Sequence, residues 1–284
     1  MSRYDFVVII DFHTHIFPPE VRSRRDEYIE RDITFAEMYT SPKAKVAIAE
    51  DLAASMEGAG VDISIALGFA WRDHELIVRH NDYLLETAMR GEGRILPFCT
   101  INMTDEGAEK EIERLAAAGV RGLGELRPES QGWDLNGAAG ERLAEMALKH
   151  NLILLFHVTE PAGHQYPGKY GLSLASFVRF ASAHRRVAVV GAHFAGGLPF
   201  SLDNDARKPV SRVVMDTAAR GYLYTPEEYR LATTRAPGRV VFGSDYPLVP
   251  QKKDIQALRE DSVDPKVLEG VLGGNAAELL GLEA

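Results

Sequence analysis

The 284-residue chain lacks the features that mark several large classes of protein. It has one cysteine, Cys99, so no disulfide can form within the chain. Its amino-terminal apolar run, residues 7–10, is far shorter than the roughly 18 residues of a membrane-spanning helix. Lys and Arg number 32 against 41 Asp and Glu, for a net charge of −9. We therefore expect a cytoplasmic protein with neither a membrane nor a nucleic acid partner.

Short apolar segments rich in β-branched residues recur eight times along the chain. They cover residues 7–12, 61–69, 95–101, 120–126, 152–158, 187–193, 211–217 and 239–245. Their apolar residues are nearly continuous rather than alternating, which is typical of parallel strands covered on both faces. Segments with apolar residues three and four apart lie between several of them, at residues 43–60, 105–119, 136–151 and 173–186. This spacing predicts helices.

The alternation of strands and helices predicts an α/β fold, a (β/α)8 TIM barrel formed by residues 1–284 as one domain. Most predicted strand ends lie 23 to 36 residues apart, whereas the first gap spans 54 residues. That gap holds a short insertion after the first strand, at roughly residues 18–45. A doubly wound open sheet is the alternative, but no GxGxxG motif follows the first strand, which weakens its dinucleotide-binding form.

Side chains that can bind a metal gather at the predicted strand ends. His13 and His15 end the first strand, His157 the fifth, His193 the sixth and Asp245 the eighth. Because residues two apart on a strand face the same way, both amino-terminal imidazoles can face the barrel axis. Imidazole and carboxylate suit a divalent transition metal, and barrel enzymes carry their chemistry at these strand ends.

Other polar residues allow more than one interpretation. Glu125 ends the fourth strand, where it either serves the metal or forms a salt bridge with Arg121 or Arg127. Asp11 is interpreted as structural. Four histidines in helical regions are expected to be surface residues; they are His74, His80, His150 and His184.

Together these motifs resemble the amidohydrolase superfamily, in its amidohydrolase-related branch of TIM-barrel metal-dependent hydrolases. The resemblance rests on DFHTHIFPP, the histidines of strands five and six, FGSDYP and the closing segment GGNAAELLGL. This branch includes aminocarboxymuconate-semialdehyde decarboxylase-type enzymes. The resemblance implies one divalent ion, zinc first with manganese, iron or cobalt as alternatives. It also implies the ligands His13, His15, His157 and Asp245, with His193 and Asp245 handling protons.

The resemblance implies a hydrolase that uses a metal-activated water on a small lactone, ester or amide. The alternative is a nonhydrolytic decarboxylase of an unsaturated or aromatic carboxylic acid. A minor alternative is a phosphodiesterase similar to TatD-like deoxyribonucleases. Glu125 resembles the strand-four glutamate of those enzymes, which can bridge two metals. A barrel that only binds a ligand, without catalysis, is the remaining hypothesis.

Loop residues are expected to select the small-molecule substrate, because Arg holds carboxylates and aromatic rings wall apolar groups. The candidates are Arg72, Arg127, Trp133, His164 and Tyr166. A homodimer formed through residues 28–45 of the insertion and the short helices near the carboxyl terminus is a further expectation.

Overall fold

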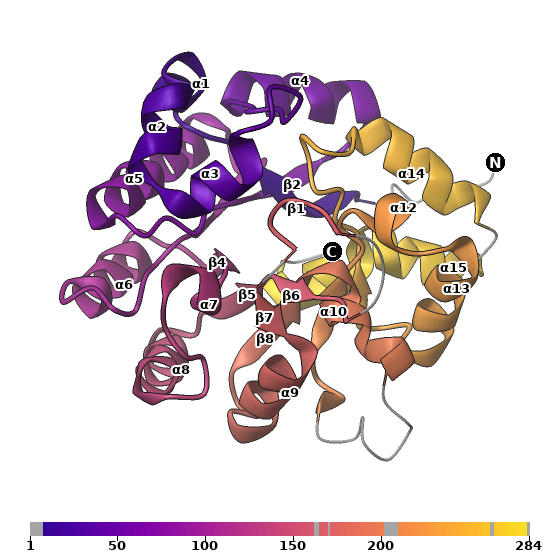
Figure 1. Ribbon diagram of the computed structural model, residues 1–284. Coiled ribbons are helices and arrows are strands. Elements are labelled where there is room, and N and C mark those ends of the chain that lie inside the picture. Colours follow the sequence, from indigo (N-terminus) through magenta and orange to yellow (C-terminus); the bar gives the residue numbers. More distant parts are fainter. Residues whose placement is uncertain (1–7, 162–164, 170, 202–209, 262–263, 283–284) are drawn as a thin grey trace.

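Eight parallel strands form the centre of the molecule and helices surround them, as Figure 1 shows for the computed structural model. The structure describes residues 8–161, 165–169, 171–201, 210–261 and 264–282. In order around the sheet the strands are β1 (Ile10–His15), β2 (Ile63–Leu67), β3 (Ile95–Cys99), β4 (Gly122–Leu126), β5 (Ile153–Phe156), β8 (Ala188–Gly191), β9 (Val214–Asp216) and β10 (Val240–Val241). All eight lie within or overlap the segments predicted as strands, so the TIM barrel is confirmed.

The first and last strands are joined by backbone hydrogen bonds. The amide of Phe12 donates to the carbonyl of Phe242 at 2.7 Å, and the amide of Asp245 donates to the carbonyl of His13 at 2.9 Å. Strand β10 is shorter than predicted because the chain bends after residue 242, and Asp245 has a φ of 64°. The bend and these bonds bring Asp245 alongside β1.

Helices of varied length follow the strands. The longer ones are α4 (Ala49–Ala59), α5 (His74–Arg90), α6 (Ala108–Ala117), α8 (Ala138–His150), α9 (Leu174–Ala183), α10 (Ala192–Ser201), α13 (Pro226–Arg235) and α14 (Gln251–Glu260). The shorter elements are α7 (Pro128–Gln131), α12 (Arg220–Leu223), α15 (Pro265–Glu269), the π-helix η2 (Gly270–Gly274), α16 (Asn275–Leu280) and the small strands β6 (Val158–Thr159) and β7 (Leu172–Ser173). Within the described ranges, each helix falls short of the length and apolarity that crossing a membrane requires.

The interior of the barrel is apolar at the end opposite the strand carboxyl ends. Side chains such as Phe12, Phe98 and Leu155 fill it, and Ala276 and Leu280 of α16 belong to the same buried cluster. The guanidinium of Arg121 donates to the carbonyl of Leu280, which fixes the helix there. Helix α16 therefore closes the floor of the barrel and leaves its other end as the place for polar chemistry.

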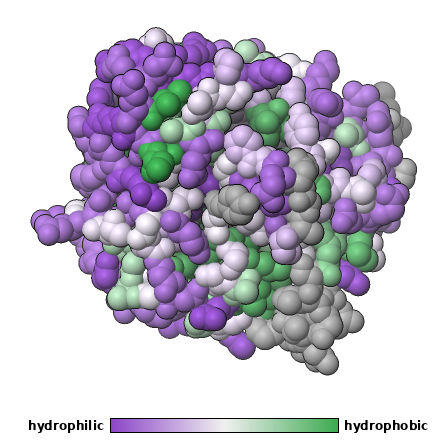
Figure 2. All heavy atoms as spheres, viewed as in Figure 1, coloured by the Kyte–Doolittle hydropathy of each residue, from purple (hydrophilic) through white to green (hydrophobic). Residues whose placement is uncertain are grey.

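The predicted insertion after β1 forms three short helices, α1 (Pro19–Ser23), α2 (Arg25–Arg31) and α3 (Ile33–Tyr39). Hydrophilic residues predominate along the left edge of Figure 2, over this part of the molecule. Underneath, an aromatic cluster packs the insertion against the loop after β2. Its largest members are Phe17, Tyr28, Phe35, Tyr39, Phe69 and Trp71.

The expectation that His80 is a surface residue is wrong. His80 is buried against this aromatic cluster, where its Nδ1 accepts from the indole Nε1 of Trp71 at 3.0 Å. Its Nε2 donates to the carbonyl of Ile16 at 2.8 Å. The helical spacing of residues 74–90 did not reveal that this position faces inward. His74 is exposed as expected, whereas His150 and His184 are half-buried.

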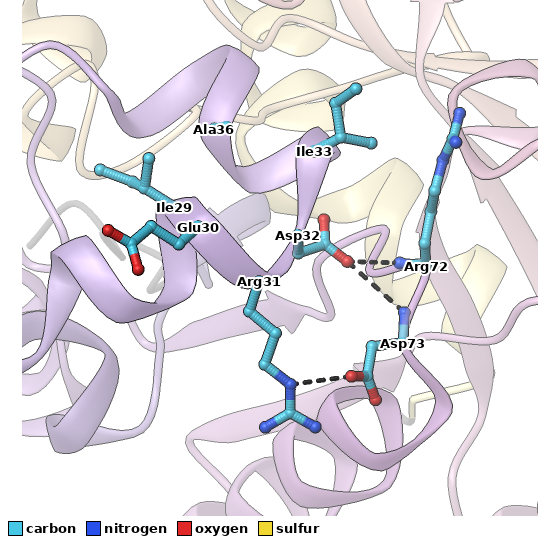
Figure 3. A pocket seen from close by; sticks show the side chains of 8 residues that line it. All are labelled: Ile29, Glu30, Arg31, Asp32, Ile33, Ala36, Arg72 and Asp73. Carbon is cyan, nitrogen blue, oxygen red and sulfur yellow. Dashed lines mark hydrogen bonds and ion pairs between the residues drawn. The ribbon is translucent and has the colours of Figure 1, made fainter.

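One carboxylate ties the insertion to the barrel. Asp32 is buried and its Oδ1 accepts from the amides of Thr34 and Phe35, so it caps α3. Its Oδ2 accepts from the amide of Arg72 at 2.7 Å, in the loop after β2 (Figure 3). The same side chain therefore begins a helix of the insertion and holds a loop at the mouth of the barrel.

We expect Asp32→Ala to lower the free energy of unfolding by about 2–4 kcal/mol, because it removes a helix cap and leaves buried donors without acceptors. Urea unfolding followed by circular dichroism measures this. The matched control is Asp264→Ala, which removes an exposed cap from α15 and should cost about 0.5–1 kcal/mol. Equal losses in the two variants would contradict the tethering role of Asp32.

Candidate metal centre

Six nitrogen- and oxygen-bearing side chains converge at the carboxyl ends of the strands. They are His13 and His15 on β1, Glu125 on β4, His157 after β5, His193 after β8 and Asp245 after β10. Every one of these positions was a candidate from the sequence. Asp245 is half-buried and the other five are buried. The barrel thus brings together residues separated by up to 232 positions in the chain.

His13, His15 and Asp245 form one group of three donors. The two imidazole Nε2 atoms are 3.1 Å apart, and each lies within 3.7 Å of Oδ1 of Asp245. A carboxylate oxygen of Glu125 lies 3.7 Å from Nε2 of His15. Ligands about 2.0–2.2 Å from a shared ion stand at such separations, so these residues fit a divalent cation.

Glu125, His157 and His193 form a second group on the other side of the glutamate. Nδ1 of His157 lies 2.9 Å from Oε1 of Glu125 and 3.2 Å from Nε2 of His193. The resemblance placed His157 with His13, His15 and Asp245, but here its nearest partners are Glu125 and His193. The salt bridge considered between Glu125 and an arginine is replaced by contacts with four histidines.

The rings of His13 and His193 are oriented by groups behind them. Nδ1 of His13 donates to Oδ2 of Asp216 at 2.8 Å, and Nδ1 of His193 donates to the carbonyl of Ala218 at 2.9 Å. In a neutral imidazole this leaves Nε2 without a proton and directs its lone pair into the site. The sequence analysis does not single out Asp216, since its contact with His13 spans 203 positions and leaves no local pattern.

The backbone that carries His193 is strained. Five consecutive residues, from His193 to Gly197, have φ between 50° and 84°. This left-handed conformation costs roughly 1–2 kcal/mol for each residue other than glycine. The amide of His193 donates to Oδ1 of Asp216, and Tyr224 donates from its hydroxyl to the carbonyl of His193. These bonds hold the turn and aim the ring, a use of strain typical of functional sites.

The buried carboxylates of the site stabilise positive charge on the groups next to them. Burial alone would lower the pKa of His13, but Asp216 and Glu125 outweigh it and raise this pKa to about 10. Burial would also lower the pKa of His193, but Glu125 and Asp245 outweigh this effect and raise the pKa to about 9. Burial lowers the pKa of His15 to about 4. A divalent cation would supply this charge in place of protons, as metal binding does generally.

The residues predicted to bind the substrate differ in their burial and in their contacts. Arg127 lies two residues after Glu125, is buried, and donates to the carbonyl of Gly168 at 2.7 Å. Burial lowers its pKa, and the nearby charge of Glu125 opposes this effect. Tyr166 donates to Glu160, a buried carboxylate that the sequence analysis missed and that also pairs with Lys169 at 3.2 Å.

Two other candidates have different surroundings, and one cannot be placed. Arg72 is exposed, bonds through Nε to the carbonyl of Ser130, and lines a surface hollow beside α2 and α3 (Figure 3). Trp133 is buried in the apolar layer between strands and helices. His164 lies outside the described residues. Asp11 is buried and accepts from Ser244 and from Gln251 of α14, contacts that fit the structural role interpreted from the sequence.

The metal-binding side chains cluster at the carboxyl ends of the barrel strands. This arrangement is that of the metal-dependent TIM-barrel enzymes. The chain belongs to the amidohydrolase family, whose model matches residues 10–282. A comparison with curated protein sequences finds no match. As a member of this family the chain is a metal-dependent enzyme.

Solved structures of low sequence identity share the fold over nearly the whole chain. The 5-carboxyvanillate decarboxylase LigW from Sphingomonas paucimobilis is 18% identical, with a TM-score of 0.78 over 98% of this chain and 100% of that one. A dihydroxybenzoic acid decarboxylase from Polaromonas sp. JS666, with bound manganese, is 15% identical, with a TM-score of 0.74 over 98% of both chains. A probable 2-pyrone-4,6-dicarboxylic acid hydrolase from Acinetobacter baumannii is 16% identical, with a TM-score of 0.63 over 96% and 99%.

We expect Asp216→Asn to weaken divalent metal binding about 10- to 100-fold, because an amide cannot accept from both His13 and the His193 backbone. Competition with a chromogenic chelator measures the affinity. Asp62→Asn, at the opposite end of the barrel, is the control and should bind as the unaltered protein does. An Asp216→Asn variant with unchanged affinity would show that Asp216 supports only the fold.

Proposed function

We propose that the protein is a metal-dependent decarboxylase of a small aromatic or unsaturated carboxylic acid. One observation carries this proposal: the donor cluster lies beside the buried Arg127, so that a substrate carboxylate can be held between a metal ion and a guanidinium. The decarboxylases of similar fold support carbon dioxide loss ahead of the hydrolysis expected first from the sequence.

We propose that one divalent ion is held by His13, His15 and Asp245, with Glu125 beside them. Manganese is favoured over the zinc expected from the sequence, because a decarboxylase of this fold carries manganese and two carboxylates are hard ligands that suit it. When bound, the ion supplies Lewis-acid chemistry, drawing electron density from the substrate oxygens.

The residues around the ion would manage the proton that this reaction needs. Loss of carbon dioxide breaks a carbon–carbon bond and leaves an electron pair on the substrate carbon, which must then take up a proton. His193 and Asp245 are the proposed donors, since both present a titratable atom to the cluster. Tyr166, which is half-buried near Arg127, would contact an aromatic ring.

Hydrolysis of a lactone is the second candidate. It is favoured by Asp245 and His193, which lie where they can accept a proton from an attacking water. A probable pyrone dicarboxylic acid hydrolase shares the fold as well. The two reactions differ in their products, because only decarboxylation releases carbon dioxide.

The test is a panel of hydroxylated benzoic acids, unsaturated acids and lactones, incubated with the manganese-loaded protein. We expect carbon dioxide release from an acid, and a loss of about 100- to 10,000-fold in kcat for Asp245→Asn. Arg90→Ala, at an exposed position of α5, is the control and should keep its activity. Lactone turnover without carbon dioxide release would replace the proposal by the second candidate.

A further inference from the structure

One buried arginine anchors the segment that supports His193. Arg220 begins α12, is 5% exposed, and reaches α14, which lies next to α12 (Figure 1). We propose that Arg220 is a positioning residue: its ion pairs with α14 hold residues 217–224 in place, so that the imidazole of His193 keeps its orientation toward the metal centre. This inference rests on the proposed function in one respect, because it takes His193 as a proton donor to the substrate.

The guanidinium of Arg220 has partners on three sides. Its Nη1 donates to Oδ2 of Asp261, at the end of α14, and its Nε lies 3.4 Å from Oδ1 of Asp254 within that helix. Its Cζ lies 4.8 Å from the centre of the Tyr229 ring on α13, a distance typical of a cation–π contact. One side chain therefore links α12, α13 and α14, which follow the neighbouring strands β9 and β10.

Two supports of His193 lie within a few residues of this anchor. The carbonyl of Ala218, which accepts from Nδ1 of His193 at 2.9 Å, lies two residues before Arg220. Tyr224, whose hydroxyl donates to the carbonyl of His193 at 2.9 Å, also donates from its amide to the carbonyl of Arg220 at 2.8 Å. The position of Arg220 therefore determines where the groups on either side of it meet His193.

The segment needs an anchor because its backbone is strained. Ala219, between Ala218 and Arg220, has a φ of 54°, a left-handed conformation that is unfavourable for a residue with a Cβ. The amide of Arg220 closes the turn by donating to the carbonyl of Thr217 at 3.0 Å. The methyl side chains of the two alanines have no polar group with which to hold this turn. The ion pairs of Arg220 supply the polar contact that they lack.

The competing account is that Arg220 contributes only to the stability of the fold. A buried ion pair is a poor source of stability, because the cost of removing the charges from water offsets their attraction. Burial raises the pKa of Asp254 to about 7, against the opposing effect of Arg220. Such a pair instead specifies where its two segments lie, and one of these segments carries the carbonyl that orients His193.

Hydrogen exchange of an imidazole proton tests the proposal without a substrate. The Nδ1 proton of His193 gives a downfield NMR signal while it is bonded to a carbonyl, and its exchange with water reports how often that bond opens. The full-length protein carries zinc for this measurement, because manganese is paramagnetic and broadens nearby signals. We expect this proton to exchange about 10- to 100-fold faster in Arg220→Met. The Nδ1 proton of His13, bonded to Asp216, is the internal reference and should keep its exchange rate.

Three further variants separate positioning from a loss of stability. Asp261→Asn removes one of the two acids, should raise the exchange rate by less than Arg220→Met does, and decides the matter if Arg220→Met does not fold. Arg121→Met removes the arginine that holds α16 at the floor of the barrel, and this matched control should leave the exchange rate unchanged. His193→Asn identifies the signal by its loss. Unchanged exchange in both Arg220→Met and Asp261→Asn would overturn the proposal.

Kinetics connect this positioning role to the reaction. In the carbon dioxide assay, Arg220→Met should lower kcat about 10- to 100-fold and leave KM within about twofold, because it alters the support of a proton donor and no substrate-binding group. Arg220→Lys, which keeps the charge, should recover part of the loss. A change confined to KM would contradict the positioning role. Absence of carbon dioxide release from the unaltered protein would overturn the proposed function, whereas the exchange rates would still decide how His193 is held.

Discussion

The hydrogen-bonded junction between the last strand and the first determines whether the centre exists. The bond from the amide of Asp245 to the carbonyl of His13 joins the two ends of the sheet at the level of the donors. Without this junction, which also includes the bond from the amide of Phe12 to the carbonyl of Phe242, the barrel would be an open sheet, and Asp245 would be separated from the histidines of β1. The floor formed by α16 and the insertion held by Asp32 both pack around a ring that this junction closes.

Much of this arrangement can be predicted from the sequence, because the metal-binding residues stand at the ends of the segments that are recognisable as strands. Buried parallel strands are continuous apolar runs, and metal-binding residues stand out at their ends, as His157 and His193 do. The alternation along a strand also predicts that His13 and His15 face one point, and their Nε2 atoms are 3.1 Å apart. These features depend on local spacing and on the single rule that parallel strands align their carboxyl ends.

Features that depend on contacts across the chain could not be predicted in this way. The grouping of His157 with Glu125 rather than with His13 depends on the radial position of each strand in the closed barrel. The role of Asp216 depends on a contact with β1, and the burial of His80 depends on an aromatic cluster that only the folded insertion creates. The left-handed turn at His193 leaves a weak signal, the pair Gly196 and Gly197, among residues with ordinary side chains.

The closing position of α16 has a consequence for the order in which the molecule is made. A ribosome releases the histidines of β1 well before the residues of β10 and α16, so a growing chain exposes these imidazoles before it can enclose them. Until Asp245 and Leu280 have emerged, the barrel has neither its final donor nor its floor. The complete centre can therefore take up a metal ion only after β10 has emerged, because Asp245 is one of its donors.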